Sequence, residues 1–252
     1  MNEKARNGFQ VSDVRFCQSP DQPVGLDPRV FYFECAKKEV FVKAIYSLVA
    51  LSLSVVLSAC AGGTFQTAGD YESGKQALYA GNNQAALSYF TQAAQANPNA
   101  VYGATLRLGI LTYLGQAQYL TGNYAEARQT LRKELSQHPS DHVALLYLGL
   151  AEARLGNRQA ALGYIENGMK GIAAFLNYVT TNFAYSFGQF WDPGGAIRAS
   201  IKTDLEMISG ANTDWPALIA AGEKLGIRIE EEEEKARQQQ QQMMEQNFGS
   251  GN

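Results

Sequence analysis

The stretch between residues 114 and 168 repeats its own pattern of small and apolar residues. The offset is 34 positions in every matching pair: Leu114-Gly115 with Leu148-Gly149, Gly122 with Gly156, Ala127 with Ala161, and Leu131 with Ile165. A unit of about 34 residues is long enough for two helices joined by a turn, and such a unit must stack on neighbours to bury its apolar face. The repeat therefore predicts an all-α solenoid.

Glycine and proline mark the expected ends of the helices. Gly81, Gly122 and Gly156 are predicted to end a first helix in the left-handed conformation that glycine adopts without strain. Pro98 and Pro139 are predicted to stop the second helices, because proline lacks the backbone donor that a continuing helix needs. The expected helices are 68–80 and 83–97, 101–121 and 124–137, and 142–155 and 158–170.

This pattern resembles the tetratricopeptide repeat, with Leu-Gly in the first helix, Gly at the turn, then Ala, a bulky apolar residue and a terminal Pro. The matching residues are Gly74, Gly81, Ala86, Phe90, Ala93 and Pro98; then Leu114, Gly115, Gly122, Tyr124, Ala127, Leu131 and Pro139; then Leu148, Gly149, Gly156, Ala161 and Ile165. The resemblance covers residues 67–170 and implies a helix–turn–helix solenoid of about three repeats. Pro98 and Pro139 lie seven positions further apart than the repeat, so we expect an unusually long helix from Val101, or a short extra turn before it.

The N-terminal region predicts export and lipid attachment. Residues 44–59 are apolar apart from Ser and Tyr, which is short for a membrane span of about 20 residues but suits the core of a secretion signal. The expected signal peptide, residues 42–59, ends in Leu57-Ser58-Ala59 and is followed directly by Cys60. The four residues Leu57-Ser58-Ala59-Cys60 resemble the bacterial lipobox, which implies cleavage before Cys60, a diacylglycerol on its sulfur and often a further acyl chain, such as palmitate, on its amine. The alternative is a buried cysteine in a hydrophobic helix.

The residues on either side of this signal extend the same prediction. By the resemblance, Ala61 after the cysteine favours the outer membrane, with the protein facing the periplasm, and residues 60–66 form a short tether. Residues 1–41 are unusually long for a segment ahead of a signal, and Val42-Lys43 would read as Met-Lys if translation began at a valine codon. We therefore interpret residues 1–41 as a non-native extension, whose two cysteines receive no disulfide or metal role.

In tetratricopeptide repeats, the first helix of each unit lines the concave face of the solenoid. Carried over by position, the resemblance implies a partner-binding face made of Tyr71, Lys75, Tyr79, Thr112, Gln116, Tyr119, Leu146, Leu150 and Arg154. Tyr and Arg are enriched at protein interfaces, so we expect a protein or peptide partner there. The alternative is that the C-terminal helices fold back into the groove. The basic and Asn residues of the carboxylate clamp found in chaperone-binding repeats are not present, which disfavours binding of a C-terminal carboxylate.

From Gly171 the sequence becomes rich in aromatic residues, and residues 171–228 are interpreted as a helical cap on the last repeat. The alternative is an aromatic site for a partner or a sugar. Pro193-Gly194-Gly195 predicts a turn before a helix over 196–209, and Arg198 beside that turn raises the alternative of an anion site. Thr213-Asp214-Trp215-Pro216 predicts another helix start. Residues 229–252 form a charged and Gln-rich tail without a core face, expected to be a solvated, fraying helix or disordered.

No set of residues in the sequence indicates catalysis, a metal or a cofactor. His138 and His142 have a spacing that suits a metal on one helix, but Pro139 between them breaks that helix, so we expect them to flank a turn. Asp141 in that turn is the expected N-cap of the next helix. The net charge of −3 and the absence of a basic run give no indication of nucleic-acid binding.

Two functions remain open at this level. The first is a non-catalytic scaffold, anchored through Cys60, that holds an envelope protein or peptide during assembly or transport. The second is a lipoprotein that binds a small ligand between the repeats and the C-terminal helices. A deep, closed, aromatic-lined cavity favours the small ligand, whereas an open groove favours the scaffold.

Overall fold

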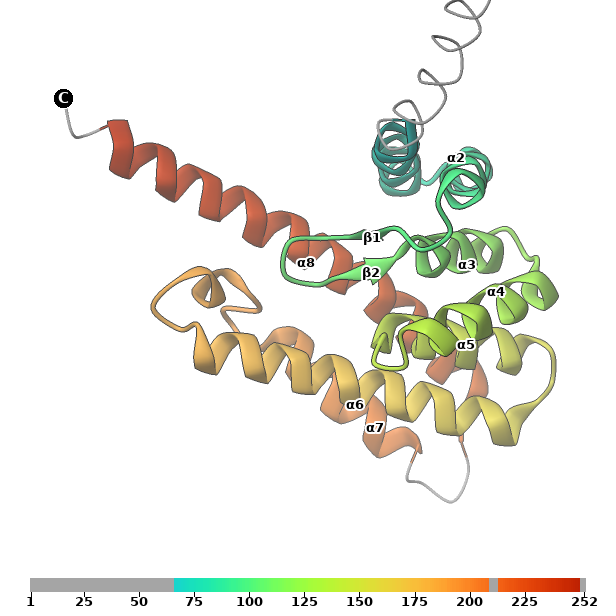
Figure 1. Cartoon of the computed structure of the whole chain (residues 1–252). Helices are drawn as coiled ribbons and strands as arrows, with labels where there is room; N and C mark the ends of the chain where they lie inside the picture. The colour runs from blue at the N-terminus through green and yellow to red at the C-terminus, as the bar shows by residue number, and fades with distance from the viewer. Residues whose placement is uncertain (1–65, 209–212, 250–252) are drawn as a thin grey trace, which may run out of the picture. The chain divides into compact units, whose positions relative to one another are not determined.

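The computed structural model describes residues 66–208 and 213–249, with side chains to residue 246 (Figure 1). The predicted extension, signal peptide and lipidation site, with almost all of the tether, lie outside these residues. The repeat region consists of three helical pairs stacked side by side, which confirms the predicted all-α solenoid. Its helices are residues 66–79 and α2 (Asn83–Ala96), α3 (Ile110–Leu120) and α4 (Tyr124–Gln137), and α5 (His142–Arg154) and α6 (Arg158–Asn182).

The repeating glycines allow the two helices of a pair to touch. A Cβ atom on Gly115 would lie 2.5 Å from the side chain of Leu131, and one on Gly149 would lie 2.6 Å from Ile165. Both Leu131 and Ile165 are fully buried, so the bulky residue of each second helix fills the space that the glycine leaves. The three turn glycines adopt the predicted positive φ, between 73° and 85°.

The extra residues between the first and second units form a β-hairpin before α3, so the predicted long helix from Val101 is wrong, and the insertion lies ahead of the helix as in the predicted alternative. Strands β1 (Val101–Tyr102) and β2 (Leu108–Gly109) pair antiparallel, and α3 begins only at Ile110. The β-branched and aromatic residues of β1 suit an extended chain. The Tyr102 ring also stacks on Tyr71, with centroids 3.8 Å apart and planes 7° apart. This contact holds the hairpin against the first helix.

The second helix of the last repeat was predicted to end at residue 170, but it is longer in the structure. Helix α6 continues to Asn182 because Ile172, Leu176 and Val179 recur at helical spacing and are buried. Gly171 lies at a close approach, where an added Cβ would overlap the ring of His142. The predicted aromatic cap forms in part. Trp191 is buried and packs edge-on against Phe175 at 5.2 Å, whereas Tyr178 and Tyr185 are 58% and 103% exposed.

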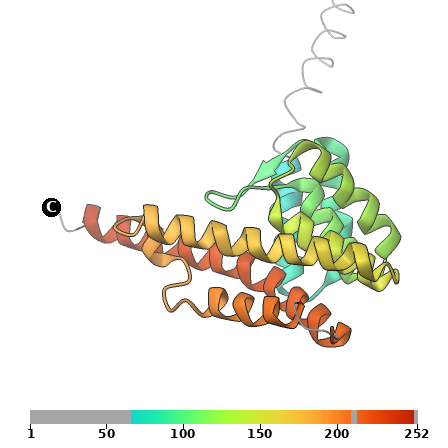
Figure 2. The same ribbon diagram turned by 90° about the horizontal axis from the view of Figure 1, so that it is seen from below.

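Three further helices follow α6: η1 (Phe187–Phe190), α7 (Ala196–Ile208) and α8 (Trp215–Gly249). Figure 2 shows α7 beside both α6 and α8, and α8 also packs against α5 and η1. The side chain of Asp214 caps the start of α8 by accepting from Ala217 N at 3.1 Å. Asp141 likewise caps α5 by accepting from Ala144 N at 2.8 Å, as predicted.

The expectation that residues 229–252 lack a core face is wrong for the first third of that segment. Helix α8 continues through it to Gly249, and Ile229, Glu230, Glu233 and Ala236 are all buried. These residues recur at helical spacing and therefore make one face. The pattern is hidden in the sequence because two of its four members are glutamates, which are rarely buried without a partner.

Candidate functional site

Helix α8 lies on much of the predicted concave face. Six of the nine residues of this face are buried: Tyr71, Thr112, Gln116, Tyr119, Leu146 and Leu150. Tyr79 is 43% exposed, and the side chains of Lys75 and Arg154 are 13% and 39% exposed. Thr112 differs from the rest because it donates to the Asp141 carboxylate at 2.6 Å and so joins neighbouring repeats. The predicted alternative, in which a C-terminal helix folds back into the groove, describes this arrangement.

Helix α8 approaches the repeats closely through two glycines. A Cβ on Gly222 would lie 2.8 Å from Leu150, and a Cβ on Gly226 would lie 2.5 Å from the Tyr147 hydroxyl. Around these points, α8 buries three apolar side chains: Leu218, Leu225 and Ile229. Tyr147 was not among the predicted groove residues, although its position beside Leu146 on a first helix was visible in the sequence.

At the N-terminal end of this contact, three hydrogen-bonded side chains, Tyr119, Arg154 and Glu223, join α3, α5 and α8. Arg154 donates from Nη2 to Glu223 Oε1 at 2.9 Å and from Nε to the Tyr119 hydroxyl at 3.2 Å. Tyr119 in turn donates to the same Glu223 oxygen at 2.5 Å. Burial raises the pKa of Tyr119, and its hydrogen bond to Glu223 adds to the rise, so the phenol remains a donor.

In the middle of the contact, the Glu230 carboxyl group is buried without a hydrogen bond of ordinary geometry to any described residue. The residue is only 3% exposed. Burial raises the pKa of Glu230 from 4.5 to about 8, with Gln116 and Lys75 nearby opposing the rise and the Glu233 carboxylate adding to it. Gln116 donates from Nε2 to the Tyr147 hydroxyl at 3.0 Å. Glu230 is therefore largely protonated at neutral pH.

At the C-terminal end of the contact, the β-hairpin loop binds a second glutamate of α8. Ala104 N donates to Glu233 Oε1 at 3.0 Å, and the backbone amides of Thr105 and Leu106 also favour the charged carboxylate. Successive amides of this kind make a concave site for anions. Lys75 lies beside the loop, 3.8 Å from Glu234. The seven-residue insertion was the only sequence signal for this site.

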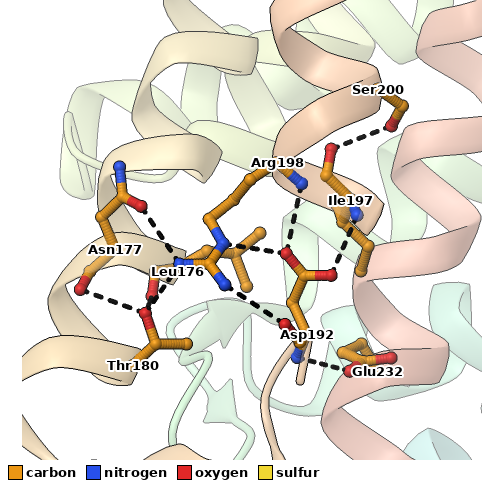
Figure 3. Close-up of polar contacts among 8 residues, drawn as sticks. All are labelled: Leu176, Asn177, Thr180, Asp192, Ile197, Arg198, Ser200 and Glu232. Carbon is orange, nitrogen blue, oxygen red and sulfur yellow. Dashed lines mark hydrogen bonds and ion pairs between the residues drawn. The ribbon is translucent and has the colours of Figure 1, made fainter. Parts of the chain in front are cut away.

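The turn before α7 also holds an anion, and that anion is the protein's own Asp192 (Figure 3). Ile197 N donates to Asp192 Oδ1 at 2.9 Å, and Arg198 Nε donates to Oδ2 at 2.9 Å. Glu232 of α8 accepts from the Asp192 amide at 2.6 Å, which ties α8 to the turn. The carboxylate occupies the position that an external anion would need, and the Gly-Gly turn is a structural turn.

The rest of the described chain gives no sign of a metal site or a membrane span. Within residues 66–208 and 213–249, no three His, Cys, Asp or Glu side chains gather in a way that could hold a metal ion. His138 caps the end of α4 and contacts Glu134 at 2.6 Å, while His142 begins α5, so the two flank a turn as expected. In the same residues, no helix combines the length and apolarity needed to cross a bilayer.

Stacked helical pairs with glycines at their close contacts define a helical-repeat solenoid. The family model described as tetratricopeptide repeat matches residues 71–142 and 113–174 of the chain. Residues 71–174 of the solenoid thus match the tetratricopeptide repeat, a fold that generally mediates protein–protein interactions and typically serves as a non-enzymatic scaffold. Neither the curated proteins nor the solved structures contain a match to this chain.

Proposed function

We propose that this chain is a lipid-anchored scaffold of the bacterial cell envelope, which binds a protein or peptide partner on the concave face of its repeats. The observation that carries the proposal is that the concave face already binds a helix, α8, through both polar and apolar contacts. Arg154, Tyr119 and Lys75 contact charged groups of α8, and the hairpin amides bind another. A face that offers cations, hydroxyls and amides beside apolar surface is suited to recognising a polypeptide.

The anchor rests on the sequence before the repeats. The lipobox-like ending at Cys60 favours acylation there, and Ala61 favours the outer membrane with the repeats facing the periplasm. Two or three acyl chains give stable attachment, since each buried methylene contributes about 0.8 kcal/mol. The anchor and the groove together would hold a captured partner at the membrane during assembly or transport.

Crosslinking and pulldown from intact cells test this function, with the wild-type chain compared with Cys60→Ser. We expect one strong envelope partner with the wild-type chain and loss of that partner from the variant. Mass spectrometry of the mature N-terminus should find acyl groups on Cys60 in the wild type. An unmodified Cys60, or equal capture of the partner by both chains, contradicts the anchored scaffold.

The small-ligand alternative has less support from the geometry. Side chains of α8 fill much of the concave face. A cleft of about 560 Å³ lies between α6 and α7, beside Asn177 and Ile201, and two smaller clefts lie at the two ends of the contact between α8 and the repeats. One of about 370 Å³ lies between Arg158 and Trp215, and one of about 340 Å³ lies beside Tyr71 and Tyr102. A ligand that copurifies with the domain and is lost on Trp215→Ala or Tyr102→Ala would favour this alternative.

A further inference from the structure

We propose that the concave face and the hairpin loop form a receptor for an acidic amphipathic helix of a partner protein, and that α8 is a resident competitor which this helix displaces. The inference rests on the proposed function, because it takes the concave face as the partner site. It adds the chemistry of the partner and a reason why the face is covered in the structure.

The receptor presents its positive and donor groups in a fixed order along the occupant helix. Arg154 and the Tyr119 hydroxyl contact Glu223 at one end. The amide of Ala104 and the Lys75 ammonium contact acidic groups of α8 at the other end. Positive charge on the repeats thus faces negative charge on the helix at both ends, which gives register and orientation to the bound helix.

The contacts of α8 define what a partner helix must carry. Counted from its first acidic residue, the occupant has acidic residues at positions 0, 7, 10 and 11, small residues at −1 and 3, and apolar residues at −5, 2 and 6. The corresponding residues of α8 are Glu223, Glu230, Glu233 and Glu234; Gly222 and Gly226; and Leu218, Leu225 and Ile229. At 3.6 residues per turn the acidic positions fall on neighbouring sides of one helix face. A segment that keeps this spacing at every position except 7, where the acid of α8 is not required, is therefore the expected ligand.

Position 7 explains how another helix can replace α8. Glu230 enters a buried space where no described residue gives its carboxyl group a hydrogen bond of ordinary geometry. The nearby Gln116 and Lys75 offset its burial only in part, so this contact opposes docking of α8. The other acidic contacts of α8 are partnered. A partner helix that keeps acids at positions 0 and 10 but carries a neutral residue at position 7 gains the favourable contacts without that opposition.

A labelled peptide of residues 213–240, carrying Glu230→Gln, provides the probe for a binding titration with the full-length chain. Gly226→Ala changes only α8 and leaves every repeat residue as it is. It should weaken the docking of α8, because the new Cβ would press on Tyr147. Gln239→Ala, on an exposed part of α8, is the matched control. We expect the Gly226→Ala chain to bind the peptide at least about tenfold more tightly than the wild-type and control chains, since the competitor is weakened.

Charge reversal tests the stated chemistry of the partner. Lys75→Glu with Arg154→Glu, placed in the Gly226→Ala chain, should weaken peptide binding by about tenfold or more. A peptide with Lys in place of Glu223, Glu233 and Glu234 should not bind the Gly226→Ala chain. A folded Gly226→Ala chain that binds no better than wild type, or that binds the Lys peptide equally well, overturns the proposal.

Hydrogen exchange of the wild-type chain provides a test that needs no variant. If α8 is displaceable, amides of residues 215–236 exchange through a local opening and therefore faster than the amides of α5. Equally slow exchange in both helices shows that α8 leaves the groove only on global unfolding, and this result also overturns the proposal. Failure of Cys60 acylation would contradict the anchor while leaving both of these experiments unaffected, so the two ideas fail separately.

Discussion

Replacing Glu230 with Gln should make the protein more stable at high pH and leave it nearly unchanged at low pH. The wild-type carboxyl group has a pKa of about 8 in the folded protein, against an ordinary value of 4.5. Between these two values the folded chain binds a proton that the unfolded chain has released. The free energy of unfolding of the wild type therefore falls as pH rises through this window.

The size of the effect follows from the shift in pKa. Each pKa unit corresponds to about 1.4 kcal/mol, so this group should destabilise the wild type by about 4 kcal/mol at pH 8 and by less than about 1 kcal/mol at pH 5. Glu233, Glu134 and Asp141 also have raised pKa values, chiefly through burial. They contribute to the pH dependence of stability in both proteins, so their contribution largely cancels in the difference between wild type and Glu230→Gln.

Urea unfolding at pH 5, 6.5 and 8, followed by circular dichroism, measures this difference. The expected result is a gap between variant and wild type that widens by about 3 kcal/mol from pH 5 to pH 8. Glu231→Gln, at the neighbouring exposed position, is the matched control and should follow the wild type at every pH. Parallel stability curves for wild type and Glu230→Gln would refute the reasoning, because they would show that Glu230 is ionised in the groove or exposed to water.

Three further substitutions, and a control at Ile227, test the fold that supports the groove. Asp141→Ala removes both the cap of α5 and the acceptor of Thr112, and should lower the free energy of unfolding by about 2 kcal/mol, measured by urea titration. Gly103→Ala places a side chain at φ 98° in the hairpin and should lower stability by about 1–3 kcal/mol while speeding hydrogen exchange of α8. Ile165→Ala should lower stability by about 2–5 kcal/mol, whereas Ile227→Ala, at an exposed position, should change thermal unfolding little.

The repeats could be predicted from the sequence because their packing is local and periodic. Gly115 and Leu131 meet within one unit, and the next unit repeats the same contact with Gly149 and Ile165. The turn glycines and the Asp141 cap are also local features, since each depends on residues within a few positions. Local rules therefore sufficed for the helices of the repeats and for most of their ends.

The hairpin and the docking of α8 could not be predicted in this way because both depend on distant residues. Tyr102 is extended where it stacks on Tyr71, some thirty positions earlier. Glu233 is buried because a loop about 130 positions earlier binds its carboxylate. A run of glutamates ordinarily indicates a solvated surface, and only the tertiary contact reveals which of them are buried.

The same contacts that hide α8 from sequence reasoning explain why its docking is conditional. A helix that is permanently part of the core would be expected to carry an apolar residue at position 230, yet α8 places a carboxyl group there beside Gln116. The groove instead binds a helix through the Arg154 cation at one end and the hairpin amide donors at the other, and it leaves the Glu230 carboxyl group without a hydrogen bond of ordinary geometry at its centre. A helix that makes the same end contacts but carries a better-suited residue at the position of Glu230 would bind the groove more tightly than α8. It can therefore replace α8, since displacement requires only a difference in affinity between two occupants of the same face.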